Sequence, residues 1–191
     1  MKNWEDQLKN KLNSTFSIKE ELSGRASVIV PIGFRSGAAQ YEILLTKRTQ
    51  KVETHKGQIS FPGGFFEISD KTLLETALRE AYEEVGLQRE RIRVLGRLEP
   101  VATLGGVVIY PWVAHVDFPD EFLVNPEEVE RTVFLSLDRL LSEGLQLRSV
   151  LVKRLGVPFH VESPGIECDG ELIWGASAKI LQQLYFLLKN Y

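Results

Sequence analysis

Three acidic side chains lie close together in one short stretch of the chain, and their types and spacing suit metal-assisted chemistry. Glu80, Glu83 and Glu84 fall within the segment KTLLETALREAYEEVGL, residues 71–87. If this segment is a helix, with about 100° of rotation per residue, the three glutamates share one face. Carboxylates at these spacings repel one another, and a hard divalent cation such as Mg²⁺ would offset the repulsion by binding their oxygens. The stretch is therefore typical of a cation site, although a solvated acidic surface would have the same composition.

The same segment carries the signals of an amphipathic helix. Asp70 is a predicted N-cap, because its carboxylate can accept from the open backbone N–H groups of the first turn. Gly86 is a predicted stop, since glycine tolerates the left-handed conformation that ends many helices. The apolar side chains share another face: Leu74, Ala77, Leu78, Ala81 and Val85. Leu73 is an exception and falls on the acidic side. We expect the helix to bury one face and present its glutamates on the other, with Arg79 pairing with Glu83.

A glycine pair precedes the helix. Gly63 and Gly64 have no Cβ, so the backbone could pass close to a diphosphate or to the acidic helix. A polar, locally basic loop lies before the pair, at residues 46–56, and contains Arg48. This loop is either a solvated connector or a wall that faces phosphate, and we expect the second for Arg48.

The order of residues in the helix resembles a known family. Residues 79–87, REAYEEVGL, are similar to the second half of the Nudix box, whose general form is G-x5-E-x7-R-E-U-x-E-E-x-G-U with U aliphatic. Here the distance from Gly64 to Arg79 is one residue longer, and Ala81 occupies a U position. Asp70, with Glu67 nearby, fills the acidic position of the first half. A longer box with alanine resembles the coenzyme A pyrophosphatase branch, whose further signature LLTxR…Gx3FPGG is similar to residues 44–48 and 57–64.

The resemblance covers most of the chain, from about Ser27 to the C-terminal helix, and it implies a fold and an activity. The implied fold is the α/β Nudix sandwich: a mixed central sheet with the box helix on one side and the C-terminal helix on the other. Periodicity alone indicates only a mixed α and β domain. The implied activity is that of a pyrophosphohydrolase acting on nucleoside diphosphates that are linked to another group, with Mg²⁺ or Mn²⁺ as cofactor.

The resemblance also implies roles for particular residues. Glu80 and Glu84 would be the main metal ligands, and Glu83 a further ligand or the partner of Arg79. Arg79 is expected to orient the glutamates. The general base stays open among three residues: Glu83, Glu84 and Glu128. Glu128 is preferred over Glu127 in the segment NPEEV, residues 125–129, because it directly precedes the apolar Val129. The candidates for substrate binding are Arg48, Gln58, Gly63 and Gly64.

The expected substrate is coenzyme A or an acyl derivative, cleaved to 3′,5′-ADP and a 4′-phosphopantetheine product. Two residues depart from the signature of that branch: Thr49 stands where the branch has Ser or Ala, and Glu53 where it has Arg. A carboxylate near a phosphate repels it. ADP-ribose or another nucleoside diphosphate sugar is therefore the alternative substrate. A non-catalytic Nudix-fold module that binds a nucleotide is the alternative from another class.

Composition bounds the remaining expectations. A chain of 191 residues fits a single domain, residues 1–191, in which residues 1–22 form an N-terminal helical extension. The net charge of −3 argues against a general nucleic-acid binder, and no apolar run approaches the roughly 18 residues of a membrane span. Cys168 is alone, which excludes an internal disulfide and fits a reducing cytoplasm. The expected partner is a small nucleotide substrate.

The remaining elements follow from apolar patterning. In the N-terminal extension, Trp4, Leu8 and Leu12 recur at i,i+4 and could dock on the main body or on a second subunit, as in a homodimer. Strands are expected at 25–34 and 41–47 as a hairpin, and at 57–62, 91–98, 107–116 and in pieces over 150–161. Helices are expected at the end of the acidic loop 118–130, within 134–141 and over 174–188. Pro111 is expected only at an edge or a bulge. His115 and His160 are expected to be structural, which leaves a zinc site without support.

Overall fold

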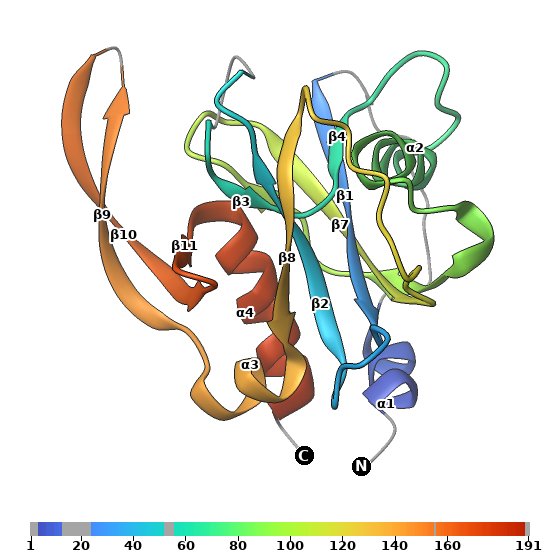
Figure 1. Ribbon diagram of the computed structural model, residues 1–191. Coiled ribbons are helices and arrows are strands. Elements are labelled where there is room, and N and C mark those ends of the chain that lie inside the picture. Colours follow the sequence, from blue (N-terminus) through green and yellow to red (C-terminus); the bar gives the residue numbers. More distant parts are fainter. Residues whose placement is uncertain (1–3, 13–23, 52–55, 155, 190–191) are drawn as a thin grey trace.

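The computed structural model describes residues 4–12, 24–51, 56–154 and 156–189. A twisted sheet runs through the middle, with α2 on one side and α3 and α4 on the other (Figure 1). The helices are α1 (Trp4–Lys11), α2 (Leu73–Val85), α3 (Leu137–Glu143) and α4 (Gly175–Lys189), with a short 3₁₀ turn η1 (Arg89–Arg91). The predicted α/β/α arrangement, with the acidic helix and the C-terminal helix on opposite sides, is confirmed.

The central sheet is mixed. Its main path runs in the order β3-β2-β1-β7-β5, while β4 pairs with β1, β6 with β7 and β8 with β2. The strands are β1 (Arg25–Gly33), β2 (Glu42–Arg48), β3 (Ile59–Ser60), β4 (Gly63–Phe65), β5 (Ile92–Arg97), β6 (Val101–Ala102), β7 (Val108–Val116) and β8 (Val129–Ser136). β1 and β7 are parallel, and β2 returns antiparallel to β1 as the predicted hairpin. β1 is buried along nearly its whole length, as expected for a strand covered on both faces.

A second, smaller sheet follows β8 and α3. Its strands are β9 (Gln146–Arg154), β10 (Val157–Cys168) and β11 (Glu171–Ile173), in the order β11-β10-β9. The far end of the β9–β10 hairpin extends away from the rest of the molecule (Figure 1). The strand-like pieces predicted around Pro158 are therefore one long antiparallel hairpin.

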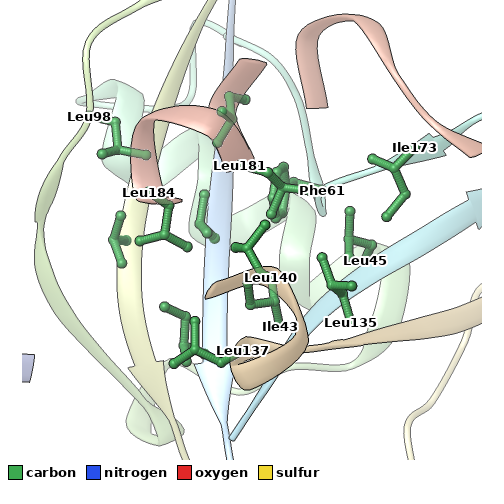
Figure 2. Close-up of a cluster of buried hydrophobic side chains, with 14 of the residues drawn as sticks. Ile43, Leu45, Phe61, Leu98, Leu135, Leu137, Leu140, Ile173, Leu181 and Leu184 are labelled. Carbon is green, nitrogen blue, oxygen red and sulfur yellow. The ribbon is translucent and has the colours of Figure 1, made fainter. Parts of the chain in front are cut away.

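Two hydrophobic clusters lie on opposite faces of the central sheet. The larger cluster packs beneath α1, α3 and α4, and Figure 2 shows part of it around Leu140 and Leu181. The smaller cluster packs beneath α2. Its members on α2 include three of the predicted apolar face, Ala77, Ala81 and Val85, which are fully buried. The carboxylate-bearing helix is thereby fixed to the sheet through its apolar side.

The N-terminal helix docks on the body of its own chain. Of the predicted extension, the structure places Trp4–Lys11 in a helix, and the other residues up to 22, apart from Leu12, lie outside the described part. Trp4, Leu8 and Leu12 are buried at 8%, 0% and 6% exposure, and α1 packs on α4 and β5. Of the two predicted docking partners, the main body is the one observed. These three side chains are thus unavailable to a second subunit.

Two sequence-based expectations about strands are wrong. The loop 118–130 does not lead into a helix; after one turn it enters β8, which pairs antiparallel with β2. Pro111 lies in β7, an interior strand between β1 and β5. Its carbonyl accepts from the Leu98 N–H at 3.0 Å, on the side where β5 ends and β6 has not yet begun. Because the nitrogen and the carbonyl of a strand residue face the same side, the missing N–H falls in this break of the ladder.

Within the described ranges, no helix is both long enough and apolar enough to cross a lipid bilayer.

Candidate active site

The helix α2 begins at a different residue from the one predicted. Thr72 is the N-cap: its backbone is extended and its side chain accepts from the Glu75 N–H at 3.2 Å. The prediction of Asp70 as the N-cap is wrong, because the Asp70 carboxylate is already engaged elsewhere. The predicted stop at Gly86 is confirmed, with a left-handed φ of 69° and backbone N–H donation back into the helix.

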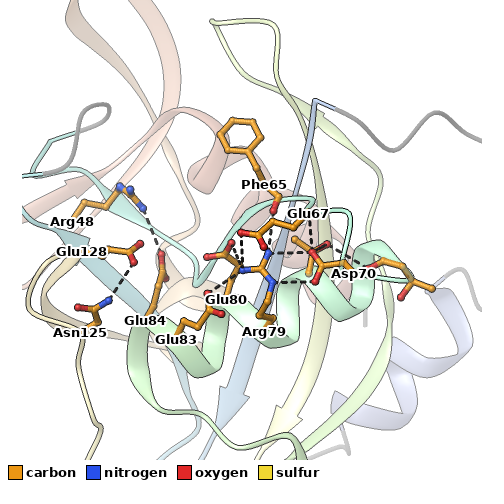
Figure 3. A network of polar contacts seen from close by, with 12 residues as sticks. Arg48, Phe65, Glu67, Asp70, Arg79, Glu80, Glu83, Glu84, Asn125 and Glu128 are labelled. Carbon is orange, nitrogen blue, oxygen red and sulfur yellow. Dashed lines mark hydrogen bonds and ion pairs between the residues drawn. The ribbon is translucent and has the colours of Figure 1, made fainter.

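Asp70 anchors an arginine that reaches across the helix. The Arg79 guanidinium donates to both Asp70 oxygens, from Nε at 3.0 Å and from Nη2 at 3.1 Å. The same guanidinium donates through Nη1 to Glu80 at 2.9 Å and to Glu83 at 3.0 Å (Figure 3). The hydrogen bonds from Arg79 hold the pKa of Asp70 below its usual range. Arg79 therefore links the start of the helix to two of the three glutamates, including the predicted pair with Glu83.

The three glutamates differ strongly in exposure. The side chain of Glu83 is 48% exposed, that of Glu80 is 14% exposed and that of Glu84 is 1% exposed. Leu73, expected on the acidic side, is fully buried. The physical reason is that this side of the helix leans on β1 and β4, so its inner edge is covered by the sheet and only its outer edge meets solvent. The acidic face is therefore a partly enclosed wall.

The glycine pair permits close approach to the helix, one of the two predicted uses. A Cβ on Gly64 would lie 2.4 Å from Oε1 of Glu80. A Cβ on Gly63 would lie 2.3 Å from the backbone oxygen of Ser27, and Gly63 has a φ of 153°. Gly64 thus leaves room for a carboxylate, whereas Gly63 lets β4 lie tightly against β1.

Glu84 is a buried carboxylate with one unsatisfied oxygen. Its Oε1 lies 3.5 Å from Nη1 of Arg48, but its Oε2 has no hydrogen-bond partner. Burial, together with the nearby charges of Glu80 and Glu128, raises the pKa of Glu84 to about 8. Arg48 and a hydrogen bond from the Gly63 backbone oppose the shift. Burial likewise raises the pKa of Glu80. The site therefore has a deficit of positive charge at Glu84.

The loop after β2 brings two more predicted residues to this region. Arg48 is the last residue of β2, and its N–H donates to the Gln58 carbonyl at 3.0 Å. The Gly57 N–H donates back to the Arg48 carbonyl at 3.1 Å. Arg48 lies beside Glu84, while Gln58 is half-buried next to β3. Glu53, the second departure from the branch signature, lies outside the described residues.

Glu128 faces the helix, and Glu127 does not. Figure 3 shows the Glu128 carboxylate beside Arg48 and Glu84, where it accepts from the Asn125 side chain at 3.2 Å. Glu127 instead points outward and pairs with Lys51 at 2.8 Å, with 72% of its side chain exposed. The geometry favours Glu128 of the two.

The donor set fits a divalent cation, although the acids are not gathered around one point. Across the described ranges, no three acidic, histidine or cysteine side chains already form a finished metal site. Arginines hold the glutamates instead: Arg79 binds Glu80, and Arg48 lies by Glu84. The unpartnered Oε2 of Glu84 and the charge deficit around it are what a cation that prefers oxygen ligands would relieve. Glu80, Glu83 and Glu84 would hold such a cation.

Glu84 should make the stability of the metal-free protein depend on pH. Its folded pKa of about 8 lies above its ordinary value of 4.5, so between these values the folded state keeps a proton that the unfolded chain has released. The free energy of unfolding should therefore fall as pH rises through this window. The lowered pKa of Asp70 acts only below its ordinary value of 3.8, outside the window.

Thermal melts with a chelator, from about pH 5.5 to about pH 8, measure this slope. We expect the melting temperature of the wild type to fall as pH rises. The fall should be smaller in Glu84→Gln, which cannot titrate at this position, and smaller in the wild type when Mn²⁺ is present. Parallel pH profiles of the two proteins would show that Glu84 is not the group responsible.

His115, His160 and Cys168 each contact other residues of the fold. His115 lies 3.6 Å from Glu5 and beside the rings of Trp4 and Tyr41. His160 is exposed and lies 3.2 Å from the Ser149 hydroxyl. Burial raises the pKa of the Cys168 thiol to about 11, so this cysteine is unreactive at neutral pH.

Two polar residues of the site have no predicted role. Asn125 begins the segment that carries Glu128 and donates to the Glu128 carboxylate, and Thr49 binds the same segment from the end of β2. The Asn-Pro start of that segment is a turn signal, and it was the only local hint for Asn125. No local pattern predicts the partner of the Thr49 hydroxyl, because Glu127, 78 positions away, supplies it.

The sequence of the chain is similar to that of a known domain and of a known protein. A model of the NUDIX domain matches residues 25–155. The chain is 35% identical over 160 residues to a Yersinia pestis protein called "Uncharacterized Nudix hydrolase NudL", covering 84% of this chain and 77% of the relative.

The fold agrees with this class. A MutT/nudix family protein from Enterococcus faecalis has a TM-score of 0.55 and 14% identity, covering 94% of this chain and 71% of the other. The Nudix domain of Shewanella oneidensis NrtR, solved with ADP-ribose, has a TM-score of 0.50 and 19% identity, covering 67% and 82%. The carboxylate-lined helix on a mixed sheet is thus that of a NUDIX domain.

The chain belongs to the Nudix hydrolase family. It is a pyrophosphohydrolase, and enzymes of this family generally use divalent metal ions.

Proposed function

We propose that the protein cleaves the diphosphate of coenzyme A or an acyl-coenzyme A to 3′,5′-ADP and the corresponding 4′-phosphopantetheine. The observation that carries the proposal is the meeting of three signature segments at Glu84. Arg48, from the end of β2, lies 3.5 Å from Glu84, and the Gly63 backbone hydrogen-bonds to it from β4. These segments correspond to the LLTxR, FPGG and box motifs that together are typical of the coenzyme A branch.

We assign the cofactor to the acidic wall of α2. Glu80 and Glu84 would be the main ligands of Mg²⁺ or Mn²⁺, with Glu83 as a further ligand or as the partner of Arg79. When bound, such ions neutralise diphosphate charge and lower the pKa of the attacking water. Arg79 orients Glu80 and Glu83 through its hydrogen bonds, so it acts as a positioning residue.

The remaining roles belong to groups around the expected diphosphate. Arg48 would supply a positive charge at the edge of the site. Gly63 and Gly64 are proposed to let the backbone pass close to the diphosphate, because neither residue has a Cβ. Gln58 follows on the same loop and is proposed to bind substrate. Glu83, Glu84 and Glu128 remain the candidates for the general base, since a base must reach the attacking water and all three lie around the site.

ADP-ribose or another nucleoside diphosphate sugar is the alternative substrate. Its support is Glu53, an acid where the coenzyme A branch carries arginine, because a carboxylate would repel the 3′-phosphate. The other departure carries less weight. The Thr49 hydroxyl donates to the Glu127 carbonyl at 2.9 Å, so it faces the protein.

The compartment and the assembly are part of the proposal. A single buried cysteine fits a reducing cytoplasm. A homodimer would have to use a surface other than the apolar side of α1, which is covered within the chain.

Turnover on coenzyme A, ADP-ribose and a nucleoside diphosphate sugar, side by side with Mg²⁺ or Mn²⁺, tests the substrate. We expect the highest kcat/KM for coenzyme A, with 3′,5′-ADP resolved by chromatography. Cleavage of ADP-ribose or the sugar nucleotide alone would favour the alternative. Tight binding of one of these nucleotides without any turnover would indicate a non-catalytic module.

A further inference from the structure

The segment that carries Glu128 is tied to two separate elements of the site. The backbone N–H of Asn125 donates to the carbonyl of Glu84 at 2.9 Å, at the end of α2. The backbone N–H of Thr49 donates to the carbonyl of Glu128 at 2.9 Å, at the end of β2. The segment therefore bridges the helix and the strand that flank the expected diphosphate.

The Asn125 side chain sets the direction of the Glu128 carboxylate. Its Oδ1 accepts from the Glu127 N–H at 3.1 Å, and its Nδ2 donates to Oε1 of Glu128 at 3.2 Å. The two ends of the amide have different partners, one a donor and one an acceptor, so only one orientation satisfies both. The amide thus couples the turn at Glu127 to the position of the Glu128 carboxylate.

Thr49 binds the same segment from the side of β2. Its side chain is buried, and the hydroxyl donates to the Glu127 carbonyl at 2.9 Å while accepting from the Lys51 N–H at 3.3 Å. The hydroxyl and the backbone N–H of Thr49 therefore donate to two successive carbonyls, those of Glu127 and Glu128. A group used in this way is not available to substrate.

These contacts act against an electrostatic force. The charge of Glu128 raises the pKa of both Glu80 and Glu84, which means that the three carboxylates repel one another. Glu128 is only partly buried, so an unrestrained side chain would turn toward water. Displacement of a reacting group by about 1 Å can cost about a hundredfold in rate. Contacts that hold the Glu128 carboxylate in place should therefore raise the rate of hydrolysis.

We propose that Thr49 and Asn125 are positioning residues that hold the Glu128 carboxylate facing Glu84. The inference rests on the proposed function, because it gives Glu128 a part in diphosphate hydrolysis. It also assigns Thr49, a departure from the branch signature, to the geometry of the site and not to substrate choice.

The test is a double-mutant cycle with a matched pair at position 49. Thr49→Val keeps the shape of the side chain and removes its hydroxyl, whereas Thr49→Ser keeps the hydroxyl. We expect Thr49→Val to lower kcat about tenfold, the lower range for residues that orient metal-site groups, with KM nearly unchanged. Thr49→Ser should retain most of the activity. In a Glu128→Gln background, Thr49→Val should cause little further loss, because its effect passes through Glu128.

Asn125→Asp supplies an independent variant. It keeps the acceptor for the Glu127 N–H but turns a carboxylate toward Glu128, so kcat should fall at least as far as in Thr49→Val. This loss too should largely disappear in the Glu128→Gln background. Independent, multiplying losses in either cycle would overturn the proposal, as would unchanged kcat in Thr49→Val.

Hydrogen exchange of residues 124–130 separates this proposal from the proposed function. We expect faster exchange in Thr49→Val and wild-type exchange in Thr49→Ser. If the wild type hydrolyses no diphosphate, the proposed function fails, and the exchange comparison still decides whether Thr49 holds the segment. Equal protection in Thr49→Val and the wild type would overturn that role.

Discussion

Glu84→Gln is expected to lower kcat about a hundredfold to a thousandfold while leaving the protein folded, the scale reached when one strong electrostatic contact of a transition state is lost. The substitution keeps the size of the side chain and removes its charge. Glu84 has an unpartnered buried oxygen, and burial raises its pKa to about 8, so a bound cation would be needed to hold this carboxylate in its charged form near neutral pH. Steady-state turnover with saturating Mn²⁺, together with circular dichroism, measures both parts.

Glu75→Gln is the matched control for this prediction. Glu75 lies in the first turn of the same helix, exposed and hydrogen-bonded to the Lys71 N–H at 2.7 Å. Its replacement should leave turnover unchanged. Wild-type turnover in Glu84→Gln would refute the assignment of Glu84 as a metal ligand.

Gly63→Ala should destabilise the folded protein by at least about 3 kcal/mol, a large effect for a single methyl group. A φ of 153° is a conformation that side chains rarely adopt, which by itself costs about 1–3 kcal/mol. The added Cβ would also meet the Ser27 carbonyl at 2.3 Å, and both atoms belong to paired strands that cannot move independently. The melting temperature and the yield of soluble protein report the loss.

Gly37→Ala separates the two causes. Gly37 has a φ of 79°, but a Cβ there would meet nothing within 4 Å. It should cost only about 1 kcal/mol, the conformational part alone. If Gly63→Ala melted as high as Gly37→Ala, the close approach of β4 to β1 would not be a constraint on the sequence.

Local signals in the sequence were sufficient for much of the fold. Gly86 ends α2 as predicted, because a left-handed cap depends on the residue itself. The apolar periodicity of α2 and α4 correctly predicted helices, and the hairpin of β1 and β2 followed from turn chemistry. The sandwich itself came from the family resemblance, because periodicity does not determine the order of strands in a sheet.

The wrong predictions concern residues whose structure depends on a partner that is distant in the sequence. Asp70 and Thr72 both have capping side chains, and Asp70 is withdrawn from that role by Arg79, nine residues further on. The segment 129–136 contains charged residues and is a strand because β2 offers it a pairing edge. A helical wheel grouped the glutamates correctly, but the burial of Glu84 depends on the sheet that covers it.

The sheet separates the two hydrophobic clusters, and this division bears on how the protein can change. The larger cluster, beneath α4, lies across the sheet from α2, whereas the smaller one supports α2 directly. Substitutions that tighten packing beneath α4 are expected to raise heat tolerance with little effect on the contacts that α2 makes on the other side of the sheet. Adaptation to a new diphosphate substrate would instead change residues of α2, of the smaller cluster and of the loops beside them. Robustness and specificity can therefore evolve, or be engineered, through largely separate sets of residues in one chain.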